Sequence, residues 1–258
     1  FGVFVVGGGG GGGCLGGMRC LLFLLVLAGS MMAADKPNFI VINIDDLGYA
    51  DIGPFGSKTN ATPNLDRMAA EGRKLTSFYA APVCSPSRAS LMTGCYPKRA
   101  LPIPHVLFPG AEVGLNPKEV TVAEVLKAAG YATACVGKWH LGDQPGMLPV
   151  DQGFDYYYGL PYSNDMGTAE DGAKSNPGAP AKAPTLSPKA KAKASARAEP
   201  SLDETGLKGS AQPPLPLVEN RTVIERVRQD GQTSITQRYT EKAVELIKPH
   251  QEEPFFLY

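Results

Sequence analysis

The sequence lacks an excess of either charge, because 25 lysine and arginine residues balance 25 aspartate and glutamate residues. Domains that bind nucleic acid usually carry a clear basic excess, so the balance argues against that class of protein. A neutral total still permits a local positive pocket that binds an anionic substrate. Histidine is scarce as well, with three in the chain.

Cysteine is also in short supply. Of five cysteines, Cys14 and Cys20 precede the part of the chain that we expect to fold, which leaves Cys84, Cys95 and Cys135. Their spacing matches no zinc site, and an odd number cannot complete a disulfide framework. An unpaired thiol in an exported chain therefore needs a reason, which the residues after Cys84 supply below.

The beginning of the chain is expected to lie outside the folded domain. Residues 1–17 contain a glycine run that suits no packed core, and we interpret them as upstream sequence from a misplaced start. Residues 18–34 combine a basic residue, a short apolar run and small residues, as a secretory signal peptide does. An uncleaved membrane anchor is the alternative, although the run is short for a span. Export would lead to the periplasm, the extracellular space or the lysosome, depending on the source.

Strand and helix patterns alternate through residues 35–258, which we interpret as one domain. Residues 38–44 are apolar on both alternating faces, as a buried parallel strand is, and residues 131–136 are predicted to form another strand. The alternation predicts an α/β fold with a mainly parallel central sheet flanked by helices. Cap residues and apolar spacing predict helices at about 63–72, 85–94, 121–130 and 234–248.

One segment interrupts this pattern. Residues from about 168 to 216 are rich in Ala, Pro, Lys, Ser and Gly and predict a low-complexity insertion or solvated loop. A polyanion-binding tail is the alternative, because basic residues cluster between 189 and 197. Residues 255–258 then read as the beginning of another buried strand, which predicts that the domain is incomplete at its C-terminus.

Polar residues follow both predicted strands. Asp45 and Asp46 follow the first, and Lys138 and His140 follow the second. Because ligands bind beyond the carboxyl ends of parallel strands, we expect the two clusters to share one edge of the sheet. Adjacent carboxylates suit Ca²⁺ or Mg²⁺, and two like charges are costly without a cation. An ordinary surface turn is the alternative for the two aspartates.

The most specific pattern is Cys84-Ser-Pro-Ser-Arg88. Pro86 at the first helical position would place Cys84 just ahead of a helix N-terminus, where free N–H groups and the helix dipole favour an anion. Arg88, one turn later, would add a bidentate donor for sulfate or phosphate oxygens. A capped helix with an incidental thiol is the alternative.

At these residues the sequence resembles the type I, formylglycine-dependent sulfatases, and in particular their arylsulfatase A-like branch. The pattern from Cys84 to Arg88, followed by Ala-Ser-Leu-Met-Thr-Gly, resembles the maturation sequence of that family. Other blocks of the family recur in the same order at residues 37–49, 62–66, 137–142 and 159–163. The resemblance implies an alkaline-phosphatase-like fold and a hydrolase acting on aryl or carbohydrate sulfate esters.

The resemblance also implies a cation and a modified cysteine. Asp45, Asp46 and Cys84 would bind a divalent cation, Ca²⁺ in most members and Mg²⁺ as the alternative. A formylglycine-generating maturation enzyme would oxidise Cys84, and the aldehyde would hydrate to a geminal diol. One hydroxyl would then attack sulfur, and the other would help to expel sulfate.

The remaining roles are carried over residue by residue. Arg88 would hold the diol and the metal-site geometry, and Lys138 would stabilise and bind the anionic sulfate oxygens. His140 would orient the diol and act as a base, as its near-neutral pKa permits. Ser163 would contact the sulfate. His105 and His250 match no catalytic position of the family and are expected on the surface or in loops.

The sequence departs from the family beyond the strand that begins at Phe255. Further metal ligands, a second Lys, a second His and a smaller C-terminal domain would come from that part. The 258 residues alone are therefore expected to bind metal weakly and to have little activity. Two alternatives are a truncated, non-catalytic relative that binds sulfated glycans and a related phosphoesterase, although the latter usually has Ser or Thr as nucleophile.

Overall fold

The computed structural model describes residues 2–6, 36–167, 214–250 and 253–258. The proposed signal peptide and almost all of the predicted insertion lie outside the described residues. No helix in the described part of the chain is long and apolar enough to cross a membrane.

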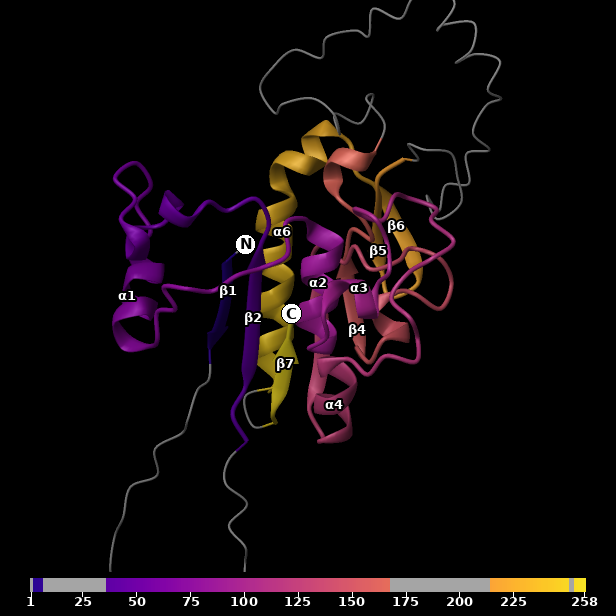
Figure 1. Cartoon of the computed structure of the whole chain (residues 1–258), viewed down its shortest axis with the longest axis horizontal. Coiled ribbons are helices and arrows are strands. Elements are labelled where there is room, and N and C mark those ends of the chain that lie inside the picture. The colour runs from indigo at the N-terminus through magenta and orange to yellow at the C-terminus, as the bar shows by residue number, and fades with distance from the viewer. Residues whose placement is uncertain (1, 7–35, 168–213, 251–252) are drawn as a thin grey trace, which may run out of the picture.

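The described strands form one mixed sheet with the order β1-β2-β7-β3-β4-β5-β6. Neighbouring strands from β2 through β7 and β3 to β4 run parallel, and β1, β5 and β6 pair antiparallel at the two sides. The predicted α/β fold with a mainly parallel central sheet is thus confirmed (Figure 1). The strands are β1 (Gly2–Val6), β2 (Phe39–Ile44), β3 (Ala132–Val136), β4 (Tyr156–Gly159), β5 (Pro216–Glu219), β6 (Thr222–Arg226) and β7 (Phe255–Leu257).

The strand at each end of the chain pairs with β2. At the edge, β1 places Gly2 opposite Ile44, so five of the residues that the sequence analysis left outside the fold are part of the sheet. At the centre, β7 lies between β2 and β3, with Phe256 in register with Phe39 on one side and Thr133 on the other. All three β7 residues are buried, which confirms the prediction of a buried strand from residue 255.

The central sheet is covered on both faces, as its alternating side chains show. Cys135 and Tyr157 belong to an apolar cluster with Met92 of α2, whereas the next residues along the strands, Val136 and Tyr158, belong to a cluster with Ile235 of α6. The helices are α1 (Pro63–Glu71), α2 (Cys84–Thr93), α3 (Pro97–Ala100), α4 (Val122–Ala128) and α6 (Gln229–Ile247), with short 3₁₀ turns between them.

The structure matches the predicted beginning of one helix and corrects that of another. The capping box of α4 forms as predicted, since Thr121 Oγ1 accepts from the Glu124 N–H at 3.1 Å. In contrast, α6 begins at Gln229, more than one turn before the predicted residue 234, because its polar first turn carries little of the apolar period that marked the helix.

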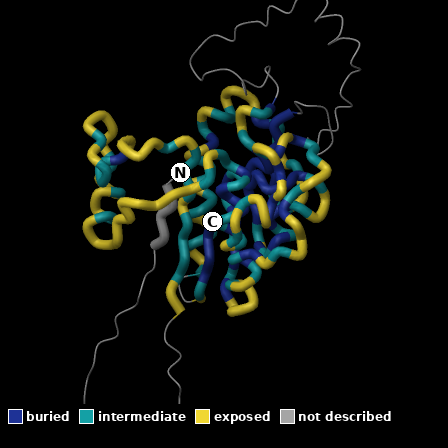
Figure 2. The backbone as a smooth tube through the Cα atoms, in the orientation of Figure 1, coloured by how far each residue is buried: buried dark blue, intermediate teal, exposed yellow. Residues whose placement is uncertain are grey.

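The arm formed by residues 45–82 projects from the sheet and carries α1 (Figure 1). The helical spacing of Leu65, Met68 and Ala69 predicts one buried face for α1, but no residue of α1 is buried, and those three are half-buried. Most of the arm is exposed (Figure 2). Its exposed residues include Tyr79, whose side chain is large.

Candidate active site

Segments that are distant in the sequence meet at Asp45, directly after β2. Asp45 Oδ2 accepts a hydrogen bond from Lys138 Nζ at 2.5 Å and from Arg88 Nη2 at 3.2 Å. Lys138 follows β3, so the predicted convergence at the carboxyl edge of the sheet is confirmed for Asp45 and Lys138. Arg88 joins them from α2.

The Asp45 carboxyl is held in its charged form. Burial alone would raise its pKa, but the hydrogen bond from Lys138 and the charge of Arg88 outweigh burial. The net result is a pKa below the usual value for aspartate. The carboxylate therefore stays anionic at neutral pH and can attract a cation.

Arg88 acts as a buried connector between three segments. Its side chain is 4% exposed. Its Nη1 donates to the backbone carbonyl of Lys138 and, at 3.0 Å, to the Tyr258 hydroxyl. Burial opposes the charge of the guanidinium, but Tyr258 and Asp45 more than compensate and raise the pKa of Arg88. The guanidinium thus fixes α2, β2 and β3 relative to one another.

The helix that carries Cys84 begins one to two residues earlier than predicted. Cys84 is its first residue and Pro86 its third, with Val83 as an extended N-cap that makes no side-chain capping bond. The predicted position of Cys84 just ahead of the helix is therefore corrected to its first turn. The thiol is free and half-buried, and it still lies where helix N–H groups lack partners within the helix.

The ring of His140 is buried after β3. Its backbone lies in the left-handed region with φ of 61°, and Nε2 lies 2.8 Å from the Leu107 carbonyl oxygen. Nδ1 has no hydrogen-bond partner within the described residues. Burial, followed by the charge of Lys138, lowers the pKa of His140 to about 4, so the ring is neutral at neutral pH.

Backbone hydrogen bonds between the segments that follow β3 and β4 continue beyond the strand ends and fix the position of His140. Beyond the strands, Trp139 N–H donates to the Leu160 carbonyl and His140 N–H to the Pro161 carbonyl, each at 3.0 Å. Ser163 lies two residues beyond Pro161, half-buried, at the beginning of a 3₁₀ turn. The structure thus brings the Ser163 segment to the same edge of the sheet.

The two carboxylates after β2 are ligands of the type that a hard cation prefers, but they are too few to complete its coordination. Asp46 is exposed and adopts a left-handed φ of 54°, next to the half-buried Asp45. Carboxylate oxygens are what Ca²⁺ and Mg²⁺ prefer, and Ca²⁺ takes six or more. Among the described residues, no three His, Cys, Asp or Glu side chains group closely enough to hold a metal ion. Asp45, Asp46 and Cys84 therefore do not form a complete ligand set.

Tyr258 is a site residue that the sequence analysis did not select. Its buried hydroxyl accepts from Arg88 and from Asn43 Nδ2, both at 3.0 Å. Tyr258 directly follows β7, just as Asp45 directly follows β2. The strand-end rule that selected the aspartates would therefore have selected Tyr258 as well.

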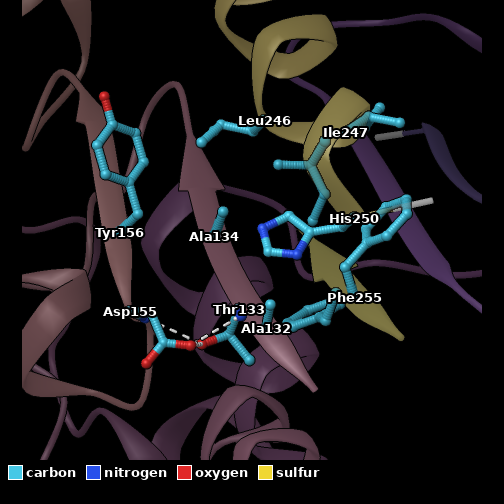
Figure 3. Close-up of a pocket in the computed structure, with 11 residues that line it drawn as sticks. Ala132, Thr133, Ala134, Asp155, Tyr156, Leu246, Ile247, His250 and Phe255 are labelled. Carbon is cyan, nitrogen blue, oxygen red and sulfur yellow. Dashed lines mark hydrogen bonds between the residues drawn. The ribbon is translucent and has the colours of Figure 1, made fainter. Parts of the chain in front are cut away.

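A pocket lies at the opposite edge of the sheet. It measures about 150 Å³ and is lined by the first residues of two strands, Ala132 and Phe255, and by His250 after α6 (Figure 3). His250 is half-buried, with Nδ1 3.7 Å from Glu253, and His105 is exposed in a loop. Neither histidine belongs to the cluster at Asp45, as predicted.

Comparisons with known proteins agree with this geometry. The family model described as Sulfatase matches residues 37–258. Bovine arylsulfatase A (Bos taurus) is 38% identical over 239 residues, which cover 91% of this chain and 42% of the relative. The chain therefore spans about two fifths of the length of that relative.

Solved structures give the same result. The PsFucS1 sulfatase from Pseudoalteromonas sp. superposes with a TM-score of 0.61 at 32% identity, covering 82% of this chain and 41% of the other. The crystal structure of Ps i-CgsB in complex with k-i-k-neocarrahexaose superposes with a TM-score of 0.55 at 30% identity, covering 83% and 42%.

Proposed function

This chain belongs to the sulfatase family, and on that premise we propose that the whole protein hydrolyses sulfate esters of aryl alcohols or carbohydrates. One observation carries the proposal. The Cys84 motif opens α2, and Arg88 of that motif joins Lys138 on the Asp45 carboxylate. A neighbour in complex with an oligosaccharide supports a carbohydrate substrate.

Formylglycine at position 84 would supply the nucleophilic oxygen as its hydrate. The chain contributes the setting for that group. Cys84 lies in the first turn of α2, where the helix dipole and its N–H groups favour an anionic sulfate. The thiol is neither in a disulfide nor fully buried, so a maturation enzyme has an unblocked target.

Lys138 and Arg88 have different roles at the negative charges of the site. The Lys138 side chain is 17% exposed and uses one of its three ammonium donors on Asp45, so it can also bind a sulfate oxygen. Arg88 is almost fully buried and has its Nη groups engaged by Asp45, Tyr258 and the Lys138 backbone. We therefore assign Lys138 to the substrate and Arg88 mainly to holding the site in shape.

Asp45 and Asp46 would hold the divalent cation, Ca²⁺ with Mg²⁺ as the alternative. Such an ion neutralises the sulfate charge and fixes its orientation. Within this chain Asp45 is kept ionised by Lys138 and Arg88, as a metal ligand must be. The remaining ligands would come from parts of the protein other than the described residues.

His140 serves as the base, and Ser163 contacts the sulfate. Burial keeps the imidazole neutral at neutral pH, so it can accept a proton there.

Residues 18–34 direct export in this proposal, and the mature chain would begin near Asp35.

The test is the mass of the peptide that spans Cys84, after expression of the full protein with a formylglycine-generating enzyme, together with hydrolysis of an aryl sulfate. We expect the aldehyde mass and sulfate release, both lost in Cys84→Ala. An unmodified thiol without sulfate release would refute the proposal and favour a non-catalytic relative. Faster hydrolysis of the matching aryl phosphate would favour a phosphoesterase.

A further inference from the structure

The backbone of Leu107 connects the nucleophile helix to His140. The Leu107 N–H donates to Ser85 Oγ at 3.2 Å, and the Leu107 carbonyl lies 2.8 Å from His140 Nε2. Ser85 is fully buried, Leu107 is 4% exposed and His140 is 1% exposed, so water does not compete for these bonds. Ser85 directly follows Cys84, which places one end of the connection beside the nucleophile position.

A second buried side chain holds the segment that follows Leu107. Asp143 Oδ2 accepts from the Gly110 N–H at 2.6 Å, and the Asp143 side chain has no cationic partner among the described residues. Nearby, the Leu115 N–H donates to the Leu141 carbonyl at 2.7 Å. The loop that contains Leu107 is thus joined to the loop after β3 at several points.

These contacts determine which ring nitrogen of His140 carries the proton. A carbonyl oxygen can only accept, so the short contact with Leu107 requires a proton on Nε2. The neutral ring then has its lone pair on Nδ1, which is buried without a partner within the described residues. An unpartnered buried acceptor is costly, and a group that donates a proton to it would remove that cost.

We propose that Ser85 and Asp143 are positioning residues that hold His140, through the Leu107 segment, with Nε2 protonated and Nδ1 free to accept a proton. The inference rests on the proposed function, because it takes His140 as the base. Neither residue touches the substrate. Each fixes the backbone that orients the ring, as partners of catalytic histidines generally do.

The first experiment reads the tautomer directly and requires no turnover. The full protein is labelled with ¹⁵N-histidine, the His140 imidazole signals are assigned with His140→Gln, and Ser85→Ala and Asp143→Ala are compared with the parent. We expect a single Nε2–H tautomer in the parent and mixed or exchange-broadened signals in both variants. Asp143→Asn, which keeps an oxygen for the Gly110 N–H, should restore the parent pattern.

The second experiment uses kinetics on an aryl sulfate. We expect Ser85→Ala and Asp143→Ala to lower kcat by roughly 10- to 100-fold with KM unchanged, since a misplacement of ~1 Å costs about this much. In the His140→Gln background the same changes should have no further effect on kcat, because their action passes through His140. Thr133→Val removes another buried hydroxyl that accepts a backbone N–H, at the opposite edge of the sheet, and should leave kcat unchanged.

The results separate the two proposals. A parent with the Nδ1–H tautomer, or variants that fold and keep both the tautomer and kcat of the parent, would overturn the positioning role. The positioning role would also be overturned if the two substitutions lowered kcat as much in the His140→Gln background as in the parent. A fixed tautomer that depends on Ser85 and Asp143, in a protein with no sulfatase activity, would support the positioning role and refute the proposed function.

Discussion

The contacts of Arg88 extend beyond the motif in which it lies. Arg88 was expected to hold the diol and the metal-site geometry, and its hydrogen bonds reach Asp45, Tyr258 and the Lys138 backbone. The motif predicts an arginine at this position. It does not predict the partners of Arg88, because they lie 43 to 170 residues away along the chain.

The first prediction at this scale concerns the pH dependence of His140. Because burial lowers its pKa to about 4, the ring is neutral and able to act as a base above that value. We expect kcat/KM to fall as the pH drops through about 4. A pH–rate profile of the full protein checks this. A limb with its midpoint near the usual histidine value of about 6.5 would show that the ring is hydrated instead of buried.

The second prediction concerns the ion pairs of Asp45. Asp45→Asn leaves the buried Arg88 without its carboxylate, so we expect about 3 kcal/mol less stability at pH 7 by denaturant unfolding. The folded pKa of Asp45 is depressed, so its contribution is present above the usual value of 3.8 and is lost as the pH falls through the folded pKa. The two proteins should therefore converge in stability at acid pH.

The control for Asp45 is a surface ion pair. Glu245 is 67% exposed and lies 2.8 Å from Lys242. Glu245→Gln should change stability by less than about 1 kcal/mol. Equal effects of the two substitutions would contradict a special role for the buried network.

At the scale of elements, strand ends and helix beginnings follow from the sequence to different degrees. The capping box of α4 and the buried strand β3 were predictable, because each has a local signature of residue type and spacing. The beginning of α6 was not, because its first turn lacks an apolar period. The strand β1 was not predicted because the glycine run that follows it argued against a packed core, although four of its five residues are apolar and all five pair with β2.

The junction of β3 and β4 supports a prediction about Gly159, which ends β4. A Cβ atom at this position would lie 1.8 Å from the Gly137 carbonyl oxygen, so the two backbones must separate if any side chain is added. We expect Gly159→Ala to destabilise the fold by roughly 3 kcal/mol and to lower activity, because this pairing places Lys138 and His140. Thermal unfolding and aryl sulfate hydrolysis would measure both effects.

Gly146→Ala is the matched control for this substitution. Gly146 adopts a φ of +84° and a Cβ there would meet nothing within 4 Å. Only the backbone strain of a left-handed residue is then incurred, about 1–2 kcal/mol. If Gly146→Ala were as harmful as Gly159→Ala, the collision with Gly137 would not be the cause.

At the scale of the whole molecule, the sheet depends on a strand that comes from the far end of this sequence. Because β7 fills the centre of the sheet, we expect Phe256→Asp, which places a charge at a position 2% exposed, to cost more than about 4 kcal/mol and to abolish cooperative unfolding. Ile224→Asp on the edge strand β6, where the side chain is 46% exposed, should cost about 1 kcal/mol or less. Circular dichroism during urea unfolding measures the stability of both variants. Similar losses of stability would contradict the central role of β7.

The fold class and most of the site were predictable because the sulfatase motifs are local. The arrangement of the molecule was less so. The half-burial of α1 and the exposure of residues 45–82 depend on which surfaces pack together. Sequence periodicity predicts an apolar face but not the element that packs against it. The Leu107 segment carries no motif at all, since it acts through backbone atoms that every residue has.

The central place of β7 has a consequence for the order of events during synthesis. Arg88 and Tyr258 are 170 residues apart, and a ribosome adds about 5–20 residues per second. Roughly ten to thirty seconds therefore pass between the emergence of the Cys84 segment and the arrival of the strand that completes the sheet beside it. We expect the nascent chain to expose Cys84 during that interval, before the completed sheet can enclose it.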